Sequence, residues 1–190
     1  MVTNETGCTP HRHAVQFYAN DAELLSTVGM FLSEGIAAGQ PAIVIATPEH
    51  RAAIESVLHA HLIDVAAARR LGDLVMLDAD ETLGAFMVDH APVGSLFRRS
   101  FGDLIEQTLR GRERTPVRAY GEMVDVLWKQ GKTEAAIRLE VLWNNLAESH
   151  PFSLLCGYAI GNFYKQTESY RKVCDLHSHV HVHAPAVAGA

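Results

Sequence analysis

Short apolar segments alternate along this chain with amphipathic segments of helical length, and this alternation limits the fold more than any other feature. Residues 42–47, AIVIAT, are almost entirely apolar, as expected of a parallel strand buried on both faces. The β-branched and aromatic residues typical of strands recur at residues 13–18, 74–79, 116–122 and 152–158. Strands joined by helices of about ten or more residues form right-handed βαβ units. The sequence therefore predicts an α/β fold, a three-layer α/β/α sandwich around a mostly parallel sheet.

The segments between these strands show the spacing of helices. In the helix expected after the first strand, apolar residues repeat every three or four positions, at Leu24, Val28, Phe31, Leu32 and Ile36. Asn20 or Asp21 is its predicted N-cap, and Pro48 suits the first turn of the next helix. Further helices are expected as two pieces within 80–111, at 123–131, at 133–149 with Thr133 as N-cap, and at 163–177 as a helix or an irregular tail.

Length and charge restrict the domain organisation and the class of partner. The chain of 190 residues is expected to form one domain at 13–176, with a flexible segment at 1–12 and a histidine-rich tail at 177–190. Its net charge of −6 argues against direct binding of nucleic acid. We found neither an export signal nor an apolar run long enough for a membrane helix, and the three cysteines form no CxxC pair. We therefore expect a cytoplasmic protein with reduced thiols and no membrane partner.

Polar and aromatic residues follow the ends of the predicted strands. Small-molecule sites in parallel α/β sheets lie beyond the carboxyl ends of the strands. The ligand-binding residues predicted at this rim are Tyr18, His50, Arg51, Asp78, Tyr120 and Glu122. His13 is expected to face the same rim as His50, where a neutral histidine and Arg51 could accept an anionic or polar ligand.

The turn after the first predicted strand lacks the residues of a phosphate-binding loop. The sequence YANDAELLS has Asn20, Asp21 and Glu23 where such a loop has glycines and a lysine. Carboxylates at a helix N-terminus interact favourably with the helix dipole and would repel a phosphate. The same acids are also ordinary residues of a first helical turn. ATP hydrolysis at this turn is therefore not expected.

Several longer motifs resemble those of one family. They are FLSEGIAAGQPAIVIATPEHRAAIESVL, LDADETL, VRAYGEMVDVLW, AAIRLEVLWNNLA, FSLLCGY and HSHV, in this order over roughly residues 13–182. In these motifs the chain resembles the MEDS family, a sensory domain named for its occurrence in methanogens and methylotrophs. The resemblance implies a RecA/KaiC-like fold, a degenerate P-loop ATPase without a functional Walker A motif, and a role in sensing hydrocarbon derivatives.

The resemblance also implies how a signal would leave the domain. Family members often carry a DNA-binding or kinase-like output domain in the same chain, and none is expected in this sequence. We therefore expect the signal to pass to a separate protein, such as a histidine kinase or a transcription regulator. A homo-oligomer is compatible with the resemblance, because RecA-like relatives pack subunit to subunit. The predicted function is a non-catalytic small-molecule sensory domain without a cofactor.

Two tryptophans could line a pocket for such a ligand. Trp128 and Trp143 lie on facing stripes of two predicted helices, where core packing is the ordinary role. With one edge open, they would instead form an apolar pocket for a small lipophilic or hydrocarbon-derived ligand, together with Tyr120, Met123, Phe152 and Cys156. The sequence leaves both roles open.

The C-terminal sequence HSHVHVH places histidines at alternate positions. In an extended segment their side chains would point to one side, and two or three could share a Zn²⁺, Ni²⁺ or Cu²⁺ ion. The predicted metal ligands are His177, His179 and His181, with His183 next in the pattern. The alternative is a tail of which only the first part docks on the sheet.

A different class of function uses the rim residues. Glu122 and Asp125 lie near the end of a strand, where a carboxylate can hold a metal or activate water. With the rim histidines they would form a metal-assisted hydrolase. A structural role for Glu122 is the alternative, as an ion pair with Arg118 or Arg138 that fixes the start of a helix.

Overall fold

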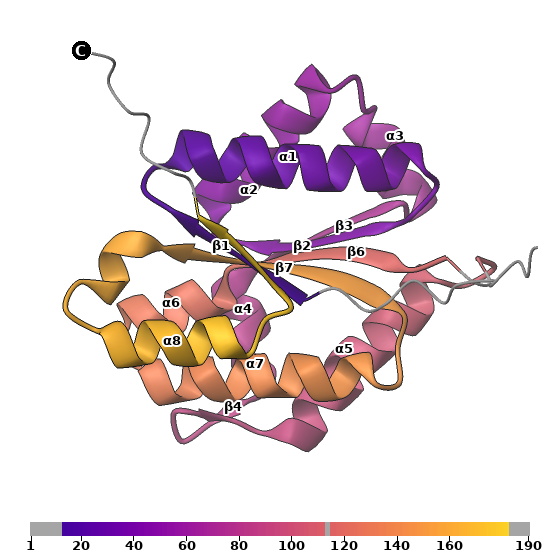
Figure 1. Ribbon diagram of the computed structural model, residues 1–190. Coiled ribbons are helices and arrows are strands. Elements are labelled where there is room, and N and C mark those ends of the chain that lie inside the picture. Colours follow the sequence, from indigo (N-terminus) through magenta and orange to yellow (C-terminus); the bar gives the residue numbers. More distant parts are fainter. Residues whose placement is uncertain (1–12, 113–114, 183–190) are drawn as a thin grey trace, which may run out of the picture.

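The computed structural model describes residues 13–112 and 115–182 and has three layers (Figure 1). The middle layer is a six-stranded sheet with the order β3-β2-β6-β7-β1-β8, in which every neighbouring pair is parallel. Its strands are β1 (His13–Tyr18), β2 (Ala42–Ala46), β3 (Leu74–Asp78), β6 (Val117–Gly121), β7 (Phe152–Ala159) and β8 (His179–Val182). Helices cover both faces, which confirms the predicted α/β fold.

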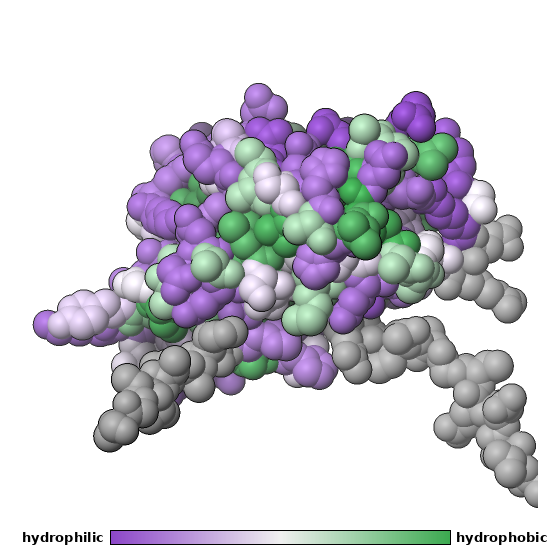
Figure 2. Space-filling model, turned by 90° about the horizontal axis from the view of Figure 1, so that it is seen from above, coloured by the Kyte–Doolittle hydropathy of each residue, from purple (hydrophilic) through white to green (hydrophobic). Residues whose placement is uncertain are grey.

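Three helices cover the face of the sheet that is uppermost in Figure 1. They are α1 (Asp21–Ala37), α2 (Pro48–Ala60) and α3 (Val65–Leu71). Asn20 is the N-cap of α1, as predicted, and Pro48 lies in the first turn of α2. Seen from this side, apolar side chains form separate patches among hydrophilic ones (Figure 2).

The opposite face carries the remaining helices. They are α4 (Ala79–Gly84), α5 (Gly94–Thr108), α6 (Met123–Lys129), α7 (Thr133–Ala147) and α8 (Thr167–Asp175), with a 3-10 turn at Ile160–Phe163. A hairpin of β4 (Met87–Val88) and β5 (Ala91–Pro92) connects α4 to α5. The N-cap of α7 is Lys132, so the predicted cap at Thr133 is wrong by one residue. Within the described part of the chain, no helix is long and apolar enough to cross a membrane.

The sheet separates two clusters of buried side chains. The smaller cluster lies under α1 and α2 and includes Leu32, Val44 and Tyr120. The larger cluster lies on the other side and includes Trp128 and Trp143. Both faces of the sheet are therefore buried, as the apolar sequence of β2 indicates.

The last strand, β8, joins the edge of the sheet beside the first. It runs parallel to β1, from the pair Ala14 and His179 to the pair Phe17 and Val182. These C-terminal residues were expected from the sequence to form a tail. The flexible segment predicted at 1–12 and the rest of that tail, residues 183–190, lie outside the described residues.

Candidate functional site

A cleft of about 460 Å³ lies at the carboxyl ends of the strands. Tyr18 comes from the end of β1, His50 from the first turn of α2, and Glu122 and Asp125 from the start of α6. The Tyr120 hydroxyl reaches the cleft by donating to the Glu122 carboxylate at 3.0 Å. The structure thus brings together four of the residues that the sequence predicted at the rim.

Glu122 is the centre of the hydrogen bonding in this cleft. Its carboxylate accepts hydrogen bonds from the Thr47 amide and the Tyr120 hydroxyl, and lies 2.6 Å from Nδ1 of His50. The other ring nitrogen of His50 lies 3.5 Å from the Asp21 carboxylate. These contacts, rather than an ion pair with an arginine, hold Glu122 in place.

The acidic surroundings favour protonated forms of the nearby groups. The hydrogen bond with Glu122 raises the pKa of His50, although burial acts in the opposite direction. Burial and the nearby carboxylates raise the pKa of Tyr18 and of Tyr120, so both hydroxyls remain donors. The raised pKa shifts His50 towards the imidazolium form between two carboxylates.

Protein donors surround the second carboxylate of the cleft as well. Asp125 accepts hydrogen bonds from the Ala159 amide at 2.9 Å, the Asn162 side chain at 2.6 Å and the Tyr18 hydroxyl at 3.2 Å. It also forms an ion pair of 2.8 Å with Lys129. The lone pairs that would bind a metal ion or activate water are thus largely used within the protein.

Arg51 and Asp78 lie beside the cleft and are paired with each other. Nη2 of Arg51 is 2.9 Å from Oδ2 of Asp78. The second oxygen of Asp78 accepts hydrogen bonds from the amides of Asp80 and Glu81 and so caps α4. Neither residue lines the cleft, and Arg51 is neutralised by its partner.

The turn between β1 and α1 is occupied by its own side chains. Asn20 Oδ1 accepts a hydrogen bond from the Glu23 amide, and Glu23 Oε2 accepts one from the Ala19 amide, each at 3.0 Å. The arrangement is close to a capping box, with the difference that the Glu23 carboxylate accepts from Ala19, the residue before the N-cap. Two backbone amides of this turn are therefore already bonded to side chains.

The two tryptophans do not line a common open pocket. Trp143 packs edge-to-face on Phe97, with ring centroids 4.9 Å apart, and Trp128 packs in the same way on Tyr158 at 5.6 Å. Both tryptophans are buried in the larger core cluster, as are Met123, Phe152 and Cys156, whereas Tyr120 belongs to the other one. The structure therefore gives the tryptophans a packing role and does not form the pocket considered from the sequence.

An apolar groove of about 530 Å³ lies elsewhere, between α1 and the strands β6, β7, β1 and β8. Met30 and Phe31 line it from α1, and Leu154 and Leu155 line it from β7. The exposed side chains of His179 and His181 border it. This groove could not be predicted from the sequence, because its lining comes from α1 and from strands that lie far apart along the chain.

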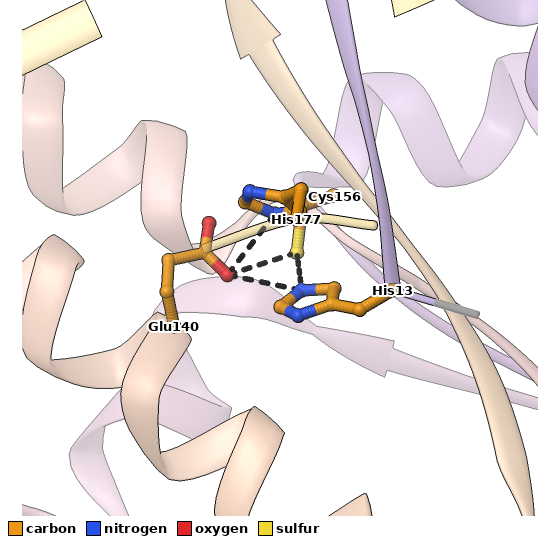
Figure 3. Close-up of side chains that lie close together, drawn as sticks. All are labelled: His13, Glu140, Cys156 and His177. Atoms are coloured by element: carbon orange, nitrogen blue, oxygen red, sulfur yellow. Dashed lines mark hydrogen bonds and ion pairs between the residues drawn. The ribbon is translucent and has the colours of Figure 1, made fainter. Parts of the chain in front are cut away.

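A buried cluster lies on the other face of the sheet, where His13, Glu140, Cys156 and His177 converge (Figure 3). One potential ligand atom from each residue lies within 4.8 Å of all the others. His13 begins β1 and therefore lies at the end of that strand opposite to the cleft. The expectation that His13 faces the same rim as His50 is wrong.

The predicted group of C-terminal histidines is divided between two places. His177 precedes β8, and its buried ring lies 3.5 Å from Glu140. His179 and His181 belong to β8 and line the groove on the α1 face. The structure therefore does not bring the three predicted metal ligands together.

Electrostatic interactions are strong within the buried cluster. Burial alone would raise the pKa of Glu140, but His177 and His13 outweigh it and hold this pKa well below the usual range. Burial would lower the pKa of His177, and the carboxylate of Glu140 raises it instead. Burial and the same carboxylate raise the pKa of the Cys156 thiol. Tyr158 donates a hydrogen bond of 2.9 Å to the second oxygen of Glu140.

Comparison with known proteins gives one family. The family described as MEthanogen/methylotroph, DcmR Sensory domain (MEDS) matches residues 12–178. No curated protein matches the sequence. The matched region contains all the residues of the cleft and of the buried cluster, and it ends immediately before β8. The chain therefore belongs to the MEDS family of sensory domains and has a sensory, signalling role.

Proposed function

We propose that this chain is a non-catalytic sensory domain that binds a small lipophilic ligand in the groove between α1 and β8. A separate signalling protein, such as a histidine kinase or a transcription regulator, would then bind differently to the domain when β8 is docked on the sheet and when it is released. Membership of the MEDS family supports the sensory role. The observation that carries the ligand class is the apolar lining of the groove.

The groove has the properties of a small-molecule site. Its volume of about 530 Å³ lies within the usual range of ligand pockets, roughly 300–1,000 Å³. Met30 is 51 % exposed although it is apolar, so a ligand lying over it would remove apolar surface from water. Arg118 and Glu34 at the border of the groove could orient a polar end of the ligand.

The position of β8 connects the ligand to an output. This strand pairs only with β1 in the described sheet, and two of its side chains border the groove. A ligand that contacts these side chains would favour the docked strand over a released one. Such a ligand shifts the equilibrium only by its difference in affinity for the two states.

The hydrogen bonding of the cleft supports a function without catalysis. The carboxylates of Glu122 and Asp125, the two residues of the predicted hydrolase, are bonded to protein donors, which leaves the metal-assisted hydrolase without support. We further propose that the fold derives from a RecA/KaiC-like ATPase, with the capped turn after β1 in the place of its phosphate-binding loop. The side chains that cap this turn would exclude a triphosphate.

The test is a thermal-shift and calorimetric screen of the full chain with small lipophilic compounds, such as short-chain alcohols and alkylbenzenes. A binding compound should raise the melting temperature, since a ligand at about 100 times its Kd stabilises a protein by about 2.7 kcal/mol. Met30→Gln should weaken binding by about five- to tenfold, because roughly 1 kcal/mol of apolar burial is lost. Leu71→Gln is the matched control, since Leu71 is also exposed and lies outside the groove.

Two results would contradict the proposal. One is a screen in which no compound binds wild-type protein. The other is equal weakening by Met30→Gln and Leu71→Gln, which would place the ligand elsewhere.

A further inference from the structure

The geometry points to a closed binding site for one divalent cation, with Zn²⁺ as the best fit, formed by His13, Glu140, Cys156 and His177. This inference is independent of the groove and of its ligand. The four residues come from β1, α7, β7 and the segment after α8, so the ion would join parts of the chain far apart in sequence.

The distances within the cluster suit a tetrahedral ion. Zn²⁺ bonds of about 2.0–2.3 Å at tetrahedral angles place neighbouring ligand atoms about 3.3–3.6 Å apart. Nε2 of His13 lies 3.2 Å from Oε2 of Glu140 and 3.4 Å from Sγ of Cys156. The same oxygen of Glu140 lies 3.4 Å from Sγ of Cys156 and 3.5 Å from Nε2 of His177. These four separations are close to the edges of such a tetrahedron, and the two remaining pairs, from His177 to His13 and to Cys156, lie within 4.8 Å.

Both imidazole rings are held in the orientation of metal ligands. Nδ1 of His177 lies 2.6 Å from the Val173 carbonyl oxygen, which can only accept, so Nδ1 carries the donated proton. Nδ1 of His13 lies 2.9 Å from Oδ1 of Asn144, and the Asn144 amide group donates to the Leu176 carbonyl, which fixes that side chain. Outer hydrogen bonds of this kind are typical of metal-binding histidines.

This arrangement directs the lone pairs of both Nε2 atoms of the neutral rings toward the Glu140 carboxylate. A metal ion placed among these lone pairs would bind them all; without one, a proton on His177 and the thiol proton of Cys156, whose sulfur lies 3.4 Å from Nε2 of His13, would face them instead. Nε2 of His177 is buried and, among the residues that the structure describes, forms no regular hydrogen bond but an ion-pair contact of 3.5 Å with Oε2 of Glu140. A metal ion would satisfy this nitrogen together with the other three ligands.

Charge balance is compatible with a metal ion at this buried position. Zn²⁺ with a thiolate, a carboxylate and two neutral imidazoles has a net charge of zero. Without the ion, one imidazolium ring balances the carboxylate, and a second would leave a net positive charge where the side chains of Glu140 and His177 are 0 % exposed. An uncompensated buried charge costs several kcal/mol. On binding, Cys156 loses its thiol proton to solvent, and its sulfur bonds to the ion.

The ion would fasten the C-terminal segment to the start of β1. Ser178, next to His177, donates from its backbone amide to the His13 carbonyl at 2.8 Å and accepts from the His13 amide at 3.1 Å. These bonds align the two histidines before any metal arrives. Metal binding would therefore stabilise the docked form of β8, which begins at the following residue.

The test uses the full chain, purified without a metal-affinity step, stripped with a chelator and then supplied with Zn²⁺ or Co²⁺. We expect one equivalent of Zn²⁺ to remain after gel filtration. Co²⁺ should give the absorption of a tetrahedral site with a thiolate-to-cobalt charge-transfer band. Cys156→Ser should abolish this band, and Cys174→Ser, the matched control, should keep it. The double variant His179→Gln, His181→Gln should also keep it.

The proposal is overturned if stripped wild-type protein retains no Zn²⁺ and gives no charge-transfer band with Co²⁺. It is also overturned if the histidine double variant loses the metal, because the ion would then lie at β8. If circular dichroism shows that Cys156→Ser does not fold, the proposal is decided by the charge-transfer band of wild-type protein and of the two control variants. A band that survives in both controls supports the site, and its loss in either one contradicts it.

Discussion

At the scale of single residues, His50 connects three helices through its charge. Glu122 at the start of α6 and Asp21 of α1 are the carboxylates in contact with its ring, while Asp125 and Lys129 line the same cleft. Because the folded protein raises the pKa of His50 above 6.5, protonation of this residue and folding favour each other.

The sign of the resulting pH dependence follows from this direction. The stabilisation by His50 is fully present below pH 6.5, the ordinary pKa, and is lost as the pH rises through the higher pKa of the folded state. Urea unfolding at a series of pH values gives the free energy of unfolding as a function of pH. In His50→Gln this free energy should fall less, as the pH rises above 6.5, than in wild-type protein. His59→Gln, at an exposed position, is the control. Parallel pH profiles of wild type and His50→Gln would contradict this interpretation.

Glu122 should make a large contribution to stability, because its carboxylate is buried among hydrogen-bond donors. Its carboxylate is 2 % exposed and faces only donors, so Glu122→Gln would direct an amide group at the Thr47 amide or at His50. Loss of hydrogen bonds to a buried charge costs about 1.5–3 kcal/mol each. We expect the free energy of unfolding to fall by at least about 2 kcal/mol, against no measurable change for the exposed Glu148→Gln. A change below about 0.5 kcal/mol would show that the network is dispensable.

At the scale of elements, β8 is an edge strand of the sheet, as is β3 on the opposite side. It pairs with one neighbour, whereas β6 and β7 each pair with two. Local opening should therefore expose the amides of β8 at a lower free energy than those of β7. Hydrogen exchange measured by mass spectrometry should show β8 exchanging faster by orders of magnitude, and ligand in the groove should slow it. Equal protection of β8 and β7 would exclude a strand that opens.

Most elements could be predicted from the sequence because their patterns are local. Buried strands such as AIVIAT and the capped start of α1 are recognisable within a few residues. The elements that were missed are short or ambiguous. The helix α3 has seven residues, β4 and β5 have two each, and the alternating HVHV of β8 fits a tail as well as a strand.

The two sites also differed in whether they could be predicted from the sequence. Residues of the cleft could be predicted because every parallel strand delivers its carboxyl end to one edge of the sheet. The buried cluster could not, because no local pattern indicates that residue 13 meets residues 140, 156 and 177. The HSHV motif and the cysteine in FSLLCGY were visible signals, but only the order of the strands brings them together.

At the scale of the whole molecule, charge should keep nucleoside triphosphates away from the cleft. The chain has a net charge of −6, and four carboxylates line the cleft, at Asp21, Glu49, Glu122 and Asp125. Magnesium-ATP should therefore neither raise the melting temperature nor release phosphate above the rate of a buffer blank. Saturable binding of magnesium-ATP with turnover would overturn both this prediction and the non-catalytic function.

The parallel pairing of β1 and β8 also determines how the domain would respond to mechanical force. Residue 13 begins β1 at one end of this pair, and residue 182 ends β8 at the other. Tension applied between these two residues would shear the strands along their length and load all the hydrogen bonds between them at once. Bonds loaded together resist more force than bonds broken in sequence, as in the unzipping of a hairpin. A single-molecule pulling experiment with these two residues as anchor points should therefore record a high force for the separation of β1 from β8, the first and last described strands.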